Sequence, residues 1–268
     1  MIYPHDFFPT GDLAPLEDLF DLNQPVWTAL TRLKQSLKEM VSANISGLPL
    51  AVPLPQTVVL YDGEFIPAEE VKIVYGDATK EKLEIYYRDR LLPGASVLCA
   101  GAVFMDDQIE IGKGVLVEPG ALLKGPAIIG DCTEVRQGAY VRGYCFVGRA
   151  CVVGHTTEMK GSIMLDGAKA GHFAYLGDSI LGRDVNLGAG TKLANLKLKR
   201  STVRVKIQDE VVDTGLRKFG AVLGDGVQTG CNSVTNPGTL LGPGSLVLPN
   251  TTAGPGFFPA KSILRQGG

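Results

Sequence analysis

The sequence predicts a mainly β fold: a left-handed parallel β-helix of six-residue repeats, preceded by a small N-terminal α/β region. Every sixth residue from Ile111 to Leu165 is apolar without a gap. The residue two positions earlier in each repeat, from Ile109 to Ile163, is mostly small or β-branched. The chain also has 34 glycines and only 7% aromatic residues, which suits many turns around a narrow interior.

A period of six fits a short strand followed by a turn, with one large and one small side chain pointing inward from each strand. Three such strands make a triangular coil, and stacked coils bury a continuous aliphatic column. The strands then pair in parallel from coil to coil. A left-handed coil of this kind is an exception to the usual right-handed crossover.

The repeat is interrupted between Leu165 and Leu181, which are sixteen residues apart, two short of three repeats. The deficit is expected within "DGAKAGHFAYLGDS". We therefore expect the coil to shorten at His172 and to push this side chain off the regular wall. A second interruption, the basic insert 195–220, alternates apolar residues at Val203, Val205 and Ile207, which predicts a β-hairpin or extended loop.

The first part of the chain does not follow the repeat. Residues 15–22 and 24–41 are predicted to be helices, with Pro25 in the first turn of the second. Strands are expected near 57–61, 71–75 and 83–87, after a proline-rich crossing at 47–56. The expected organisation is a cap region at 1–95, the β-helix with its insert at 96–255, and a tail at 256–268. The cap would cover the open sheet edge of the first coil.

Composition excludes several classes of function. The net charge of −2 and pI near 6.0 provide no basic field for nucleic acid or an anionic membrane, so neither partner is expected. No apolar run is long enough for a membrane span, and the N-terminus does not resemble a signal peptide. The five cysteines form no CxxC pair, which predicts reduced thiols in a cytoplasmic protein without a metal. Cys145 and Cys151 occupy small inward positions.

Two activities known on such β-helices are disfavoured by the residues present. A carbonic anhydrase needs three histidines around a metal, but His5 lies outside the repeat, and His155 and His172 lack the close spacing of such a site. A nucleotidyltransferase needs a glycine-rich phosphate loop, and the glycines of the first ninety residues are scattered.

Four segments, "TEVRQGAYV", "GHTTEMKGS", "GAKAGHFAYLGD" and "DVNLGAGTKLANLK", resemble the acetyltransferase half of the bifunctional N-acetylglucosamine-1-phosphate uridyltransferase/glucosamine-1-phosphate acetyltransferase family. The resemblance covers roughly residues 109–250. It implies a homotrimer whose active sites are shared between β-helices. It also implies transfer of an acetyl group from acetyl-CoA to an amino-sugar phosphate, with no metal needed.

The resemblance also implies a role for each matching residue. His172 would be the general base, and backbone N–H groups near "GAG" (188–190) would stabilise the oxyanion. The sugar phosphate would be bound by Arg136, Lys160, Tyr175, Asn186, Asn195 and Lys218. Ala189 and Cys231 would lie along the acetyl-CoA path. His155 is expected at a corner or facing solvent.

Departures from the family leave alternatives open. Leu196 replaces an aromatic sugar contact, and the long gap between Asn195 and Lys218 looks more like archaeal sugar-1-phosphate nucleotidylyltransferase C-terminal domains. A binding protein that kept the sugar-phosphate cleft but lost turnover is one alternative. An O-acetyltransferase acting on another sugar is a second.

Overall fold

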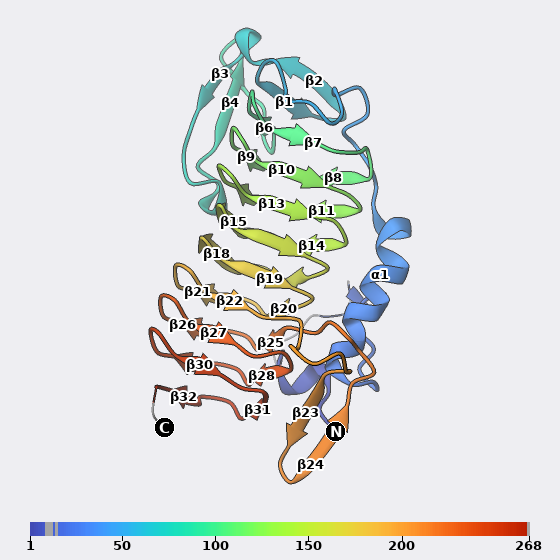
Figure 1. Ribbon diagram of the computed structural model, residues 1–268. Helices are drawn as coiled ribbons and strands as arrows, with labels where there is room; N and C mark the ends of the chain where they lie inside the picture. Colours follow the sequence, from blue (N-terminus) through green and yellow to red (C-terminus); the bar gives the residue numbers. More distant parts are fainter. Residues whose placement is uncertain (9–12, 14–15, 267–268) are drawn as a thin grey trace.

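The computed structural model, which describes residues 1–8, 13 and 16–266, confirms a parallel β-helix of about nine turns (Figure 1). In the described part of the chain, the solenoid has three faces. The first-face sheet contains, in spatial order, β2 (Glu64–Pro67), β1 (Val58–Tyr61), β6 (Ser96–Leu98), β9 (Leu116–Val117), β12 (Glu134–Val135), β15 (Val152–His155), β18 (Lys169–His172), β21 (Asn186–Leu187), β26 (Gln228–Thr229), β29 (Leu246–Val247) and β32 (Ile263–Leu264).

The other two faces have eight strands each in the described residues. The second-face sheet contains β7 (Val103–Phe104), β10 (Leu122–Lys124), β13 (Tyr140–Arg142), β16 (Glu158–Lys160), β19 (Tyr175–Gly177), β22 (Lys192–Leu193), β27 (Val234–Thr235) and β30 (Thr252–Ala253). The third-face sheet contains β8 (Ile109–Ile111), β11 (Ala127–Ile129), β14 (Cys145–Val147), β17 (Ile163–Met164), β20 (Ile180–Leu181), β25 (Ala221–Leu223), β28 (Thr239–Leu241) and β31 (Gly256–Phe258).

The core lies along the axis of the solenoid, as the repeat predicts. The large inward residues from Ile111 to Met159 are all buried in one aliphatic cluster. The small inward threonines satisfy their hydroxyls within the wall: Thr133 Oγ1 donates to the carbonyl of Gly148, and Thr157 Oγ1 to that of Ala170. These hydrogen bonds let polar side chains occupy the interior without leaving buried groups unpaired.

The position of the shortened repeats differs from the sequence prediction. The strand register pairs Val147 with Met164 and Met159 with Leu176, so Met164, not Leu165, points into the core. Two repeats are therefore one residue short, at 160–163 and 177–180, where the second face turns into the third. His172 lies in a repeat of full length, and the expectation that the coil shortens there is wrong. Adjacent apolar residues made the inward one indistinguishable by counting.

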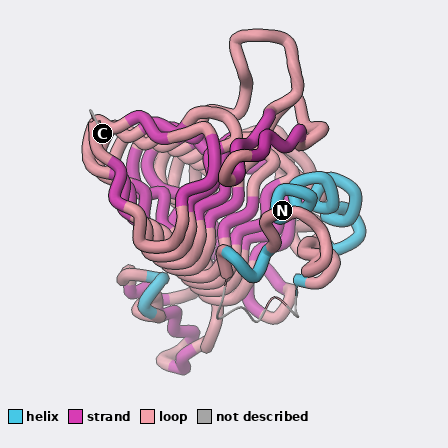
Figure 2. Tube along the Cα trace, turned by 90° about the horizontal axis from the view of Figure 1, so that it is seen from below, coloured by secondary structure: helices cyan, strands magenta, loops and turns pink. Residues whose placement is uncertain are grey.

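The N-terminal region only partly acts as the expected cap. Residues 47–67 cover the first coil: Ala51 and Leu54 N–H groups donate to the carbonyls of Phe104 and Ala102, and β1 pairs antiparallel with β6. The described residues before position 47 lie instead along the third face, where α1 (Ala29–Met40) packs (Figure 2). Its buried stripe, Leu30, Leu33 and Leu37, meets outward side chains of the solenoid such as Ile163, Leu165 and Ile180.

Other elements of the N-terminal region can be compared with their predictions. The strands expected near 57–61, 71–75 and 83–87 correspond to β1, β3 (Lys72–Val74) and β4 (Glu84–Tyr87), and β4 also pairs with β5 (Arg90–Leu91). The prediction of a helix at 15–22 is wrong for its described part, because 16–22 contains turns and irregular backbone and no α-helix. Short 3₁₀ helices span Pro4–Asp6, Val26–Thr28, Ala68–Glu70 and Ala78–Lys80, and Pro25 directly precedes the second.

The insert and the C-terminus complete the fold. The insert forms the predicted hairpin, β23 (Arg204–Ile207) with β24 (Glu210–Asp213), and Val203, Val205 and Ile207 are buried against the cluster that also holds α1. The segment 256–268 is not a separate tail in its described part. β31 and β32 continue the third and first faces, because Phe258 and Leu264 pair in register with Leu241 and Val247.

Candidate functional site

The corner between the first and second faces brings three predicted residues into one line. We call His155, His172, Ala189 and Cys231 the corner column, because they occupy the same position in four successive coils. His155 and His172 pair in register, the Gly190 N–H donates to the His172 carbonyl, and the Asn232 N–H donates to the Ala189 carbonyl. The His155 and His172 rings stack, with centroids 5.6 Å apart. His172 and Cys231 are exposed.

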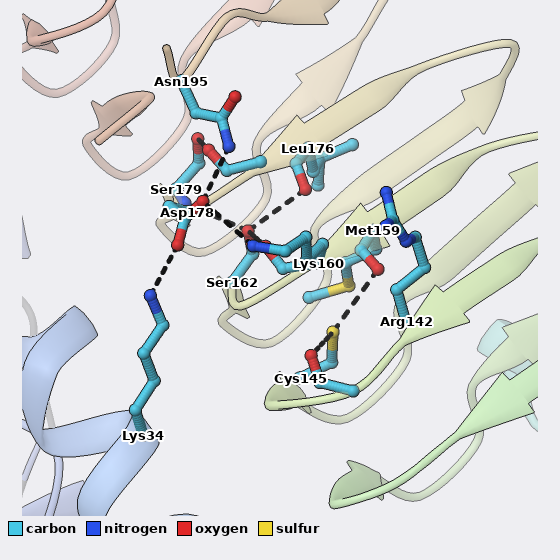
Figure 3. A network of polar contacts seen from close by, with 12 residues as sticks. Lys34, Arg142, Cys145, Met159, Lys160, Ser162, Leu176, Asp178, Ser179 and Asn195 are labelled. Carbon is cyan, nitrogen blue, oxygen red and sulfur yellow. Dashed lines mark hydrogen bonds and ion pairs between the residues drawn. The ribbon is translucent and has the colours of Figure 1, made fainter. Parts of the chain in front are cut away.

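The second predicted group gathers around Asp178, a residue that sequence reasoning did not single out (Figure 3). Asp178 is 0% exposed. Its Oδ2 atom accepts from Asn195 Nδ2 at 2.6 Å and from Lys160 Nζ at 3.4 Å, and its Oδ1 atom accepts from Lys34 Nζ at 2.6 Å. Tyr175 Oη donates to Asn195 Oδ1 at 3.4 Å. The structure thus brings Lys160, Tyr175 and Asn195 together; we call these three and Asp178 the polar cluster.

The tyrosine of the polar cluster is held as a neutral phenol. Partial burial, followed by the nearby carboxylates of Glu158 and Asp178, raises the pKa of Tyr175 above its ordinary value. The hydroxyl therefore keeps its proton throughout the physiological range and is available as a hydrogen-bond donor.

Arg142 was missed by the sequence reasoning and lies beside this cluster. It ends β13, one coil from Lys160, because Val141 pairs in register with Met159 (Figure 3). Its guanidinium forms an ion pair with Glu158 and lies 5.6 Å from the centroid of the Tyr140 ring. The spacing was a usable signal: Arg142 and Lys160 are three full repeats apart, which places them on the same face.

Arg136 is not part of the polar cluster. It follows β12, and its Nε and Nη2 atoms donate to Glu134 Oε2 at 2.8 and 2.7 Å. Glu134 is only 5% exposed, and its other oxygen accepts the backbone N–H of Ala78 at 2.9 Å. The arginine therefore neutralises a buried carboxylate that holds the N-terminal region to the first face.

The two remaining residues predicted to bind the sugar phosphate, Asn186 and Lys218, lie on either side of the polar cluster. Asn186 is exposed on the first face, in register between Lys169 and Gln228. Lys218 is exposed where the insert returns, opposite Leu196, and the next residue donates its N–H to the Asn195 carbonyl. A groove of about 550 Å³ opens at Leu196, lined by Ala194, Leu196, Lys197, Leu198, Lys199, Arg204, Asn236, Pro237 and Pro255.

Two of the three backbone N–H groups at 188–190, where oxyanion donors are expected, already have hydrogen-bond partners in the wall. The Gly188 N–H donates to the Thr229 carbonyl at 2.9 Å, and the Gly190 N–H donates to the His172 carbonyl at 2.9 Å. Both amides therefore belong to the hydrogen bonds between coils. For metals, no group of three or more His, Cys, Asp or Glu side chains suited to hold an ion occurs among the residues described.

Comparison with known proteins finds one matching domain family and several similar proteins. The GMPPB C-terminal domain family matches residues 123–246. A bifunctional sugar-1-phosphate nucleotidylyltransferase/acetyltransferase from Sulfurisphaera tokodaii is 41% identical over 86 residues, 32% of this chain and 21% of that protein.

Longer matches occur to proteins named bifunctional protein GlmU. The one from Methanococcus maripaludis (strain C5) is 32% identical over 233 residues, 77% of this chain and 56% of that protein. The one from Acaryochloris marina is 24% identical over 249 residues, 78% of this chain and 50% of that protein. The chain thus spans at most about half the length of these relatives.

No helix in the described residues is long and apolar enough to cross a membrane. The β-helix of this chain therefore has homologues that are named bifunctional sugar-1-phosphate nucleotidylyltransferase/acetyltransferase and bifunctional protein GlmU.

Proposed function

We propose that this protein transfers an acetyl group from acetyl-CoA to the amine of an amino-sugar phosphate such as glucosamine-1-phosphate. The observation that carries the proposal is the placement of two cationic side chains, Arg142 and Lys160, in successive coils of the second face. They lie next to Tyr175, which follows the exposed His172 in the same repeat. The acetyltransferase activity in the name of the Sulfurisphaera tokodaii relative supports the same reaction class.

In this proposal His172 is the general base. As the sugar amine attacks the thioester carbonyl carbon, a new C–N bond forms and the C–S bond breaks. His172 takes the proton from the amine nitrogen and passes it to the departing thiolate, so charge and protons balance. An imidazole suits this role because it can take up and release a proton near neutral pH.

The polar cluster orients the acceptor. Arg142 and Lys160 would donate charge-assisted hydrogen bonds to the phosphate, and Tyr175 and Asn195 would orient the sugar. Lys218 lies where it can close the site from the insert. These contacts position the amine rather than perform chemistry.

A homotrimer would complete the site. Asn186 is exposed on the first face, away from the polar cluster, and would meet the acceptor bound to a neighbouring subunit. Acetyl-CoA would run along the corner column past Ala189 and Cys231. The groove beside the insert, with Lys197, Lys199 and Arg204 in its wall, is suited to anionic groups of a ligand.

The test is thiol release from acetyl-CoA with glucosamine-1-phosphate or galactosamine-1-phosphate as acceptor. We expect His172→Ala to lower kcat by roughly 10²–10⁴-fold, as for loss of a general base. His155→Ala is the matched control, since it removes the neighbouring imidazole of the corner column. It should lower kcat by less than about tenfold. Equal losses in both variants would contradict the assignment of His172 as the base.

Light scattering on the same samples checks the assembly. We expect three times the chain mass of 28.5 kDa. No turnover with either acceptor, in folded trimeric protein, would contradict the enzyme and favour the binding-protein alternative. A thermal shift with the sugar phosphates would then identify the retained cleft.

A further inference from the structure

The N-terminal helix supplies a charge to the polar cluster. Lys34, on α1, reaches Asp178 Oδ1 at 2.6 Å from the side of the third face (Figure 3). Asp178 and Lys34 are 144 residues apart in the sequence. Lys34 also lies outside residues 123–246, the part of the chain that matches a known domain family. Its contact with the cluster is therefore a feature that α1 adds to the solenoid.

The Lys34 side chain passes Gly161, which lies where the second face turns into the third. A Cβ atom at Gly161 would lie 3.2 Å from Asp178 Oδ1 and 3.4 Å from Lys34 Cε, so glycine leaves the room through which the lysine reaches the carboxylate. The helix itself is held in place by Leu30, Leu33 and Leu37, which are all buried against the third face. Lys34 follows Leu33 directly and is thereby fixed beside Asp178.

A fully buried carboxylate needs compensating charge and hydrogen bonds. The two short contacts of Asp178, 2.6 Å each, are with Lys34 and Asn195, whereas Lys160 is 3.4 Å away. Lys34 therefore donates to Oδ1 of Asp178, whereas Lys160 donates to Oδ2, which also accepts the hydrogen bond from Asn195. The Lys160 side chain, 27% exposed, can therefore direct its remaining N–H donors out of the second face.

We propose that Lys34 is a positioning residue: by neutralising Asp178 it frees Lys160 to bind the phosphate of the acceptor. This inference rests on the proposed function of the polar cluster. Without Lys34, Lys160 becomes the nearest cation to the buried carboxylate and moves onto it, away from the ligand. Lys34 touches no substrate and acts only through Asp178 and Lys160.

The experiment compares Lys34→Met with Lys34→Arg in the full chain. Lys34→Met keeps the length of the side chain but removes its charge, and we expect the KM for glucosamine-1-phosphate to rise roughly tenfold, the effect of one weakened charge-assisted hydrogen bond. We expect kcat to change by less than about twofold, because His172 is unaffected. Lys34→Arg should restore KM. Lys38→Met, an exposed lysine one turn further along α1, is the control for lost charge and should leave KM unchanged.

A double-mutant cycle separates positioning from a general loss of stability. With Asp178→Asn in place no buried charge remains, so adding Lys34→Met should change KM by less than about twofold. An unchanged KM in Lys34→Met would overturn the role of Lys34 while the proposed function stands. An equal rise in both backgrounds would also overturn it. If the wild type neither turns over nor binds glucosamine-1-phosphate by calorimetry, the proposed function and this inference both fail.

Discussion

The burial of a carboxylate determines what the basic residue paired with it can do. Glu134 accepts hydrogen bonds from the guanidinium of Arg136 and from the N–H of Ala78, so Arg136 has a structural role. Glu158, the partner of Arg142, has a side chain 35% exposed. Exposed ion pairs contribute little, so phosphate can replace Glu158 at Arg142 at small cost. Burial of the partner therefore distinguishes a structural arginine from one available to a ligand.

Substitution of the two arginines should have different effects, on KM for Arg142 and on stability for Arg136. Arg142→Ala is expected to raise the KM for glucosamine-1-phosphate by roughly tenfold, through loss of a charge-assisted phosphate contact, with little change in stability. Arg136→Ala should lower the free energy of unfolding by about 1–3 kcal/mol, because Glu134 loses its charged partner. Steady-state kinetics and urea unfolding of both variants measure these effects. A larger KM effect for Arg136→Ala would place the phosphate on the first face instead.

At the scale of the element, the insert is a hairpin with two different sides. In β23, Val205 and Ile207 are buried while Arg204 and Lys206 are exposed. The alternation was visible in the sequence because the strand has a period of two. The sequence did not show what the buried side packs against. It joins an apolar cluster of N-terminal residues and outward side chains of the third face, and β23 lies next to β31.

The hairpin therefore belongs to the folded structure rather than to a mobile loop. Val205→Ala should lower the free energy of unfolding by about 2 kcal/mol, through lost apolar burial and the cavity left behind. Val211→Ala on β24, where the valine is 63% exposed, is the matched control and should stay within about 0.5 kcal/mol. Urea unfolding of both variants tests this. Equal, small effects would mean that the hairpin does not unfold together with the solenoid.

At the scale of the whole molecule, stability depends on a continuous column of buried apolar side chains inside the coils. Cys145 and Cys151 lie in that column, and burial raises the pKa of both thiols to about 12 from 9.0. The folded chain keeps these thiols protonated between those two values, whereas the unfolded chain releases the protons. Unfolding is therefore favoured as the pH rises through this range, and full stability is present only below about pH 9.

This predicts a specific alkaline loss of stability. Between pH 9 and 12 the free energy of unfolding should fall by up to about 1.4 kcal/mol per pH unit for each buried thiol. The Cys145→Ala/Cys151→Ala double variant should show a shallower slope, even if the small cavities lower its stability at neutral pH. Chemical unfolding across this pH range measures both slopes. Parallel slopes would mean that other groups, such as tyrosines, cause the alkaline loss.

The sequence alone was sufficient to predict the solenoid and part of the candidate site. The inward repeat is a local property, because each strand is too short to bury anything but its own large and small side chain. Counting repeats therefore also predicts that residues three full repeats apart fall in a line, whereas the 17 residues from His172 to Ala189 include a short repeat that counting did not locate. Arg142 and Lys160 could have been placed together by the same counting.

Tertiary structure decided the rest. At Met164 and Leu165 both residues are apolar, and only the strand register shows which one enters the core. The Lys34–Asp178 contact and the seat of α1 on the third face join segments that no periodicity connects. Arg136 likewise resembled a ligand residue until the buried Glu134 beside it was known. A repeat specifies which residues face inward, whereas the charges on the outer faces gain their partners only when distant parts of the chain pack together.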